Sequence, residues 1–166
     1  MRRPAGFTIL EIIVVLLLMS ILAATLLGRS VTTASMDLNS ATDKIRNQLR
    51  FAQAEAMKGA YEAYPVWGVK SEGAQYWMFQ GMNPAANEVR VPGGDYSGTD
   101  NKINKADIGV TEVEDFTIFF DRIGKPYTKY TSPSDNEPLA SIKTITLKAG
   151  SEPRTITITP KTGMIR

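Results

Sequence analysis

The sequence lacks both cysteine and histidine among its 166 residues. Without cysteine the chain can form no disulfide and offers no thiol nucleophile, and without histidine it has no histidine-based triad and no usual zinc ligand set. Catalysis would have to rely on carboxylates, lysine, serine or tyrosine alone. We therefore predict a protein that is not an enzyme and that binds no cofactor.

An excess of charge of one sign is also missing, because 19 lysines and arginines stand against 17 aspartates and glutamates. A balanced chain has no overall field to draw it onto nucleic acid or anionic lipid. Arg2 and Arg3 are nevertheless the only charges ahead of a long apolar run. The length leaves room for one soluble domain.

The apolar run covers residues 7–27 and contains a single charge, at Glu11. As a helix with a rise of about 1.5 Å per residue, it would span about 31 Å, close to the hydrocarbon thickness of a bilayer. Arg2 and Arg3 favour a cytoplasmic N-terminus, which places the chain after Gly28 on the other side of the membrane. The sequence thus predicts a single-pass anchor.

An ordinary secretory signal peptide, cut after small residues such as Ala23 and Ala24, is the alternative interpretation. Glu11 argues against it, because a carboxylate at the centre of a membrane helix costs about 2.5–3.5 kcal/mol and a mere targeting segment has little reason to carry one. The helical pattern also continues beyond Ala24.

The start of the apolar run carries a specific motif, which consists of Gly6, Phe7, Thr8, Ile9, Leu10 and Glu11 behind a short basic leader. This arrangement resembles the processing motif of type IV prepilins. The resemblance implies that a prepilin peptidase cuts between Gly6 and Phe7 and methylates the new amino group of Phe7. It also implies that Glu11 pairs with the amino terminus of a neighbouring subunit during assembly.

The resemblance further implies a bacterial inner-membrane protein with its C-terminal domain in the periplasm, later part of a periplasmic or surface filament. The implied partners are other pilin or pseudopilin subunits, the prepilin peptidase and the inner-membrane assembly platform. Simple physics agrees with these roles. Gly6 has no side chain to obstruct a protease, and Glu11 needs an opposite charge once helices surround it.

Beyond Gly28 the apolar residues keep helical spacing on one face, which predicts an amphipathic helix over residues 29–59. The stripe consists of Leu38, Ala41, Ile45, Leu49, Ala52 and Ala56. No proline lies between Phe7 and Met57, so anchor and amphipathic segment can form one helix. Gly59 is expected to end it in a left-handed cap.

After the helix the pattern becomes strand-like. Short apolar or aromatic runs at 66–69, 76–79 and 116–120 predict strands, and the alternation at 144–148 and 155–159 predicts a hairpin joined by residues 149–153. Residues 121–126 are typical of a tight turn, in which Gly124 supplies positive φ and Pro126 interrupts strand pairing.

Residues 81–109 are rich in Gly, Asn, Asp, Pro and Ser and are too polar to supply core strands, so we predict a long loop. The expected organisation is a leader at 1–6, a transmembrane and assembly helix at 7–28, the amphipathic helix at 29–59 and an antiparallel sheet domain at 60–166. This is an α+β, pilin-like fold in which a long N-terminal helix packs on the sheet.

Three further stretches, at 45–60, 119–128 and 156–165, resemble the minor pseudopilins of H type from type II secretion systems and related minor pilins. Major pilins often carry a proline near the position of Gly28 and a C-terminal disulfide, and both are missing here. The resemblance therefore implies a structural minor subunit of a type IV pilus or type II secretion filament. A DNA-binding minor pilin of a DNA-uptake filament is the alternative, although the sequence has no dense basic cluster.

Three further groups of residues could support other chemistry. An acidic group could perform acid–base work but is more typical of solvated strand and turn residues; it consists of Glu112, Glu114, Asp115 and Asp121. Oxygen ligands in the long loop could bind calcium but are also ordinary loop residues; they are Asp95, Asp100, Asn101, Asn104 and Asp107. Aromatics near Lys58 and Lys70 could stack on nucleic acid but more often form a core; they are Tyr61, Tyr64, Trp67, Tyr76, Trp77 and Phe79.

Overall fold

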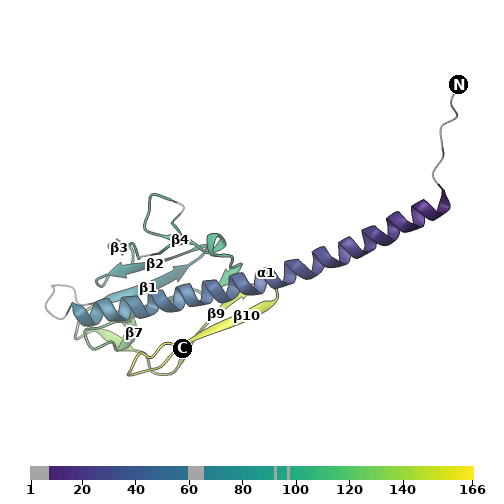
Figure 1. The fold of residues 1–166 in the computed structure, drawn as a ribbon. Helices are drawn as coiled ribbons and strands as arrows, with labels where there is room; N and C mark the ends of the chain where they lie inside the picture. Colours follow the sequence, from purple (N-terminus) through teal and green to yellow (C-terminus); the bar gives the residue numbers. More distant parts are fainter. Residues whose placement is uncertain (1–7, 60–65, 92, 97) are drawn as a thin grey trace.

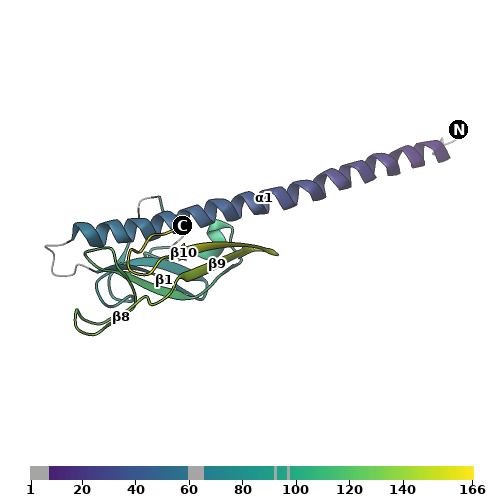
Figure 2. The same ribbon diagram turned by 90° about the horizontal axis from the view of Figure 1, so that it is seen from below.

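A computed structural model describes residues 8–59, 66–91, 93–96 and 98–166, with the backbone alone for residues 26–35. One long helix, α1 (Ile9–Lys58), lies with its second half across one face of an antiparallel sheet region, while its first half projects beyond the sheets (Figure 1). The view from below shows the same arrangement (Figure 2). The predicted α+β fold, with a helix packed on antiparallel strands, is confirmed.

The strands form two sheets. The larger has the order β3-β2-β1-β6-β7-β8 with β4 also paired to β2, and the smaller has the order β10-β9-β5. The larger sheet comprises β1 (Trp67–Glu72), β2 (Gln75–Gln80), β3 (Glu88–Val89), β4 (Ile103–Asn104), β6 (Phe116–Phe120), β7 (Pro126–Tyr130) and β8 (Asn136–Pro138). The smaller comprises β5 (Glu112–Val113), β9 (Lys143–Ala149) and β10 (Glu152–Ile158), and a short 3-10 helix, η1 (Lys105–Ile108), follows β4.

The core lies between α1 and both sheets. All six residues of the predicted apolar stripe, from Leu38 to Ala56, are at most 1% exposed. They belong to one cluster with strand residues from both sheets, among them Val69, Ile118 and Ile145. Burial of these side chains supplies the main driving force for docking the helix, because each large apolar side chain removed from water contributes about 1.5–3 kcal/mol.

A second apolar cluster covers the opposite face of the larger sheet and is mostly aromatic. Its members are Val66, Trp77, Phe79, Phe119, Tyr127 and Tyr130. The Phe79 and Phe119 rings meet edge to face with centroids 5.2 Å apart. Alternate residues of β2 therefore point to different clusters, as the two-residue period of a strand requires.

Several local expectations are wrong. Gly59 has φ −75° and not a left-handed conformation, and its N–H bonds to the Glu55 carbonyl to close the last turn of α1. Pro126 does not interrupt pairing but begins β7 opposite Phe120, a position where the missing N–H is tolerated. The expected positive φ of Gly124 is confirmed, at 76°.

The C-terminal hairpin is tighter than expected. Glu152 pairs with Ala149, so the turn is Gly150 and Ser151 alone, and Pro153 lies within β10. The long segment 81–109 also departs from expectation, because it contains β3, β4 and η1. It contributes to the core through Val91, Ile103 and Ile108, which are at most 6% exposed.

Candidate functional site

The N-terminal turn of α1 is where the sequence places the processing and assembly residues. Thr8 is the N-cap of the helix, and its hydroxyl accepts a hydrogen bond from the Glu11 backbone N–H at 3.3 Å. Glu11 is thus the third helical residue, at the spacing of a capping box. Its carboxylate lies near the positive end of the helix dipole, which favours a negative charge there.

This position changes one sequence argument. The insertion cost of a carboxylate at the centre of a membrane helix does not apply in full, because Glu11 lies in the first turn and not at the centre. The predicted cleavage and methylation residues, Gly6 and Phe7, lie outside the described residues. The cleavage site therefore stays a prediction.

The first half of α1 has no packing partner. Every residue from Thr8 to Thr25 is exposed, and the large apolar side chains among residues 9–22 are between 48% and 80% exposed. Ser20 and Thr25 turn their hydroxyls back to the carbonyls of Leu17 and Leu22, both at 2.8 Å. These two hydroxyls are therefore satisfied within the helix, and apart from the Glu11 carboxylate the segment presents a largely apolar surface.

Among the residues whose side chains the structure describes, no helix combines the length and apolar character of a membrane span.

The acidic group is engaged in separate contacts and does not form a pocket of paired carboxylates. Each member meets a basic or hydroxyl partner, so the predicted role of solvated strand and turn residues fits better than acid–base work. The partners are Lys148 for Glu112 at 2.9 Å, Lys143 for Glu114 at 2.6 Å, Lys105 for Asp115 at 3.5 Å and Tyr127 for Asp121 at 2.8 Å.

Three of the five candidate calcium ligands have partners elsewhere. Asp95 pairs with Lys44 at 2.5 Å, Asn101 accepts from Arg90 at 3.0 Å, and Asn104 caps η1 through the Ala106 N–H. Within the part of the chain that is described, no three acidic side chains come close enough together to hold a metal ion. The side chains of Asp95, Asn101 and Asn104 therefore serve the fold of the domain.

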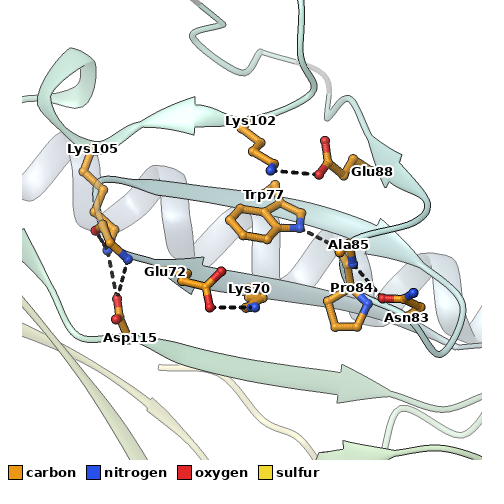
Figure 3. A network of polar contacts seen from close by, with 11 residues as sticks. Lys70, Glu72, Trp77, Asn83, Pro84, Ala85, Glu88, Lys102, Lys105 and Asp115 are labelled. Carbon is orange, nitrogen blue, oxygen red and sulfur yellow. Dashed lines mark hydrogen bonds and ion pairs between the residues drawn. The ribbon is translucent and has the colours of Figure 1, made fainter.

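The aromatic residues are divided between the two faces of the larger sheet and do not form an open stacking platform. Trp77 lies on the face turned away from α1 (Figure 3). The ammonium groups of Lys102 and Lys70 lie 4.5 and 5.5 Å from its ring centre. Each lysine is also paired with a carboxylate, Glu88 or Glu72. Tyr61 and Tyr64 lie outside the described residues.

Lys105 was not singled out by the sequence, yet it is only 5% exposed. Its ammonium donates to the carbonyls of Gly73 at 2.6 Å and Val113 at 3.1 Å, and it faces Asp115 (Figure 3). A buried charge persists only when it is paired and hydrogen-bonded, and these contacts meet that need. Lys105 therefore joins the β1–β2 turn, η1 and β5.

A junction at the end of α1 was also missed. The Gln53 side-chain amide donates to the carbonyls of Gly124 at 2.8 Å, Gly163 at 3.1 Å and Thr162 at 3.3 Å. Arg50 adds a bond to the Ile165 carbonyl at 2.9 Å. The three stretches that resemble H-type minor pseudopilins thus meet here, and that resemblance was the available signal.

Burial changes the titration of the tyrosines. It raises the pKa of Tyr127 to about 12, with the adjacent Asp121 carboxylate adding to the effect. Burial also raises the pKa of Tyr76, Tyr96 and Tyr130 above the usual value of a phenol. The Tyr127 hydroxyl donates to Asp121 and the Tyr96 hydroxyl accepts from the Val91 N–H, so both phenols hold neighbouring parts of the domain together.

Comparison with known proteins gives one finding. Residues 1–27 match the family model described as the prokaryotic N-terminal methylation motif. No curated protein and no solved structure matches the chain significantly. Proteins with this motif are structural subunits and not enzymes; the motif implies processing by a prepilin peptidase and assembly with other pilin subunits. The chain therefore carries, on residues 1–27 and so partly within α1, the N-terminal methylation motif that marks the type IV pilin and pseudopilin class.

Proposed function

We propose that the chain is a structural minor subunit of a type IV pilus or type II secretion filament. It is made as an inner-membrane precursor with its domain in the periplasm, cut between Gly6 and Phe7, methylated at Phe7 and assembled through its N-terminal helix. The observation that carries this proposal is the match of the methylation motif to residues 1–27, which include the start of the 50-residue helix α1.

The unpartnered first half of α1 supports an assembly role. A helix with apolar side chains on all sides is stable in an apolar environment, because exposing those side chains to water is unfavourable. Lipid supplies that environment for the stored precursor, and the helices of neighbouring subunits supply it in the filament. The same helix serves both states, because its second half is already held by the domain through Leu38, Ile45 and Leu49.

Glu11 makes the packing of this helix with the helices of neighbouring subunits specific. A carboxylate brought among apolar helices needs an opposite charge, and the free amino group created at Phe7 supplies one on an adjacent subunit. Within the described part of the monomer Glu11 has no ion pair. This supports the proposal that Glu11 pairs with the amino group of Phe7 on a neighbouring subunit.

The role as a minor subunit rests on two features of the sequence and one of the fold. The position of Gly28 has no proline, and the chain has no cysteine for a C-terminal disulfide. In the fold, the helix end, the glycine turn and the terminal strand pair meet through Gln53. The terminal region is thus held by hydrogen bonds and packing in place of a covalent link.

The deciding experiment is N-terminal sequencing and intact mass of the full-length protein from cells with an active prepilin peptidase. We expect a chain that begins at Phe7 and carries one added methyl group. Cells that contain an inactive peptidase are the matched control and should yield the uncut chain. A start at Thr25 or close to it would instead identify a conventional signal peptide and overturn the proposal.

A further inference from the structure

Exposed apolar side chains gather around the Gln53 junction, at the end of the domain where α1 ends (Figure 1). Ile123 and Met164 each adjoin a glycine whose carbonyl accepts from Gln53. The Met57 sulfur lies 3.1 Å from where a Cβ at Gly124 would stand. These three apolar side chains are between 45% and 70% exposed. Single apolar side chains on a surface are ordinary, but a group of them on one junction indicates a contact surface.

The β9–β10 hairpin adds a fourth apolar side chain. Lys143 pairs with Ile158, so the preceding residue, Ile142, lies beside Thr159. The Thr159 N–H donates to the Met164 carbonyl at 3.0 Å, which places Ile142 next to the same turn. Ile142 is 62% exposed. Four of the six exposed large apolar side chains that are described from residue 36 onward therefore gather at this end of the domain.

Basic side chains without an acidic partner gather at the same end. Of the lysines and arginines with described side chains, six have no carboxylate within ion-pair distance. Arg90 is the member of this set that lies away from the junction, where it bonds to Asn101 and stacks on Tyr96. The other five belong to the junction or border it: Arg50, Arg122, Lys125, Lys161 and Arg166.

The described carboxylates at this end do not neutralise these charges. Asp121 accepts from the Tyr127 hydroxyl at 2.8 Å and from two backbone N–H groups of its own turn. Glu55 pairs with Lys58 at 2.6 Å. The exposed apolar side chains therefore lie beside positive charge that is not paired. We call this surface the distal patch, and it consists of Met57, Arg122, Ile123, Lys125, Ile142, Lys161 and Met164.

An anionic lipid surface matches both features of the distal patch. Basic side chains bind the negative headgroups, and protruding apolar side chains enter the boundary between headgroups and acyl chains. A nucleic acid would match the basic side chains alone, because isoleucine and methionine have no ring face on which a base could stack. A small anion such as phosphate would likewise leave the apolar side chains in water. The combination therefore favours lipid.

The distal patch lies at the opposite end of α1 from the predicted anchor (Figure 1). Gly28 and Met57 are 29 residues apart on this helix, which corresponds to about 44 Å at about 1.5 Å per residue. The patch is therefore directed away from the membrane in which the anchor is expected to lie. A lipid surface that contacts the patch then belongs to a second membrane.

We propose that the distal patch binds a membrane surface that contains anionic phospholipids. Arg122, Lys125 and Lys161 contact the headgroup phosphates, and the four apolar side chains of the patch enter the headgroup region. The contact with lipid does not depend on the proposed function. Its assignment to a second membrane does rest on that function, which places the anchor in the inner membrane.

Binding can be measured on the full-length protein with its anchor held in nanodiscs of phosphatidylcholine, which leave the domain accessible. We expect these nanodiscs to float with vesicles made of equal parts phosphatidylglycerol and phosphatidylcholine. The bound fraction should be at least about tenfold larger than with vesicles of phosphatidylcholine alone. Added salt should weaken the binding, because salt screens the attraction between charges. Empty nanodiscs should stay unbound.

Two sets of substitutions separate the distal patch from the net charge of the protein. Arg122→Gln with Lys125→Gln and Lys161→Gln should lower the partition coefficient at least about tenfold, because each basic residue near an anionic lipid surface contributes about fivefold. A control set removes three basic side chains that are paired with carboxylates, and it should change binding by less than about twofold. It consists of Lys44→Gln, Lys148→Gln and Arg154→Gln. Urea midpoints equal to that of the wild type show that both sets are folded.

Insertion of the apolar side chains can be followed with an environment-sensitive dye on an introduced cysteine, because the chain has no cysteine of its own. A dye attached at Ile123→Cys should shift its emission to shorter wavelengths when anionic vesicles are added, because it enters the headgroup region. Met36→Cys is the matched control. Met36 is 66% exposed and lies outside the distal patch, so a dye attached there should not respond.

Any of three results would overturn the inference: equal binding to both kinds of vesicle, equal loss of binding from the two sets of substitutions, or no shift in emission at Ile123→Cys. Binding to double-stranded DNA that the patch substitutions abolish, without binding to vesicles, would assign the patch to nucleic acid and overturn it as well. Vesicle binding does not require cleavage between Gly6 and Phe7, so these results leave the proposed function intact. Failure of that cleavage would count against the proposed function and not against lipid binding.

Discussion

The two halves of α1 belong to one continuous helix but lie in different surroundings. From Thr8 to Thr25 every side chain is exposed, whereas the stripe from Leu38 to Ala56 is at most 1% exposed. The first half is apolar on all sides, and the second is apolar on one side only. The second half is stabilised by the domain it packs on, and the first depends on whatever surrounds it.

This difference separates folding from assembly. In most proteins helical stability comes from tertiary packing of an apolar face and not from intrinsic propensity. The second half meets that condition within the monomer. The first half meets it only in lipid or among other helices, so changes there should alter assembly and leave the stability of the domain alone.

The largest expected effect is on assembly, from Glu11→Ala. The variant should remain in the membrane at an undiminished level, because removing a carboxylate makes an apolar helix easier to insert. Filament number and crosslinking to neighbouring subunits should fall at least about tenfold, because the Phe7 amino group of a neighbour loses its counter-charge. Ser20→Ala, which removes a hydroxyl already bonded within the helix, is the control. Equal filament counts at matched membrane levels would refute the pairing role.

Truncating one leucine in each half sharpens the comparison through domain stability. Leu49→Ala should lower the free energy of unfolding by about 2–5 kcal/mol, because it removes a fully buried side chain from a packed core. Leu17→Ala, at a position that is 57% exposed, should change it by less than about 0.5 kcal/mol. Chemical unfolding of the full-length protein in detergent micelles, followed by near-UV circular dichroism, measures both. A comparable loss from Leu17→Ala would show that the first half is part of the folding unit.

The junction that holds the end of the second half can be tested with two glycines. Gly163 and Gly150 have nearly equal φ, 64° and 63°. A Cβ on Gly163 would stand 2.3 Å from the Gly124 carbonyl oxygen, whereas one on Gly150 would meet nothing within 4 Å. Gly150→Ala should lower the free energy of unfolding by about 1–2 kcal/mol, from backbone strain alone. Gly163→Ala should lower it by about 1–3 kcal/mol more, because of the clash. Equal losses of stability in denaturant melts would mean that the turn at Gly163 does not pack closely against the turn at Gly124.

The smallest expected effect concerns pH and belongs to the sheet domain alone. Tyr127 donates to Asp121 at 2.8 Å, and its pKa is raised to about 12 by burial first and by that carboxylate second. A phenol in the unfolded chain titrates near 10. The folded state therefore keeps the Tyr127 proton to a higher pH than the unfolded chain does. The stabilisation that this phenol supplies is complete below about pH 10 and is lost as the pH rises towards 12.

We accordingly expect the urea midpoint of the full-length protein to fall between pH 10 and 12, and to fall less in Tyr127→Phe. Tyr96→Phe, at a less buried phenol in the long loop, is the comparison variant. An identical fall in wild type and Tyr127→Phe would assign the alkaline sensitivity to other tyrosines.

Much of the fold followed from periodicity. The spacing of three and four residues predicted the buried face of α1, and strict alternation predicted β9 and β10 with the correct faces. Gly124 was correctly assigned a positive φ. The errors came where local preference competes with tertiary contacts. Pro126 could begin a strand because its neighbour Phe120 needed no N–H from it, and Gly59 ended the helix through a bond to Glu55.

The sequence alone determined the N-terminal motif, the continuity of the helix and the identity of its buried stripe, because these depend on residues that are close together in the chain. Only the tertiary structure decided which distant residues meet. Gln53 joins Gly124 to Gly163, and Lys105 joins three segments. Such contacts depend on sheet order and on the packing of α1, and neither is encoded in any local pattern of residues.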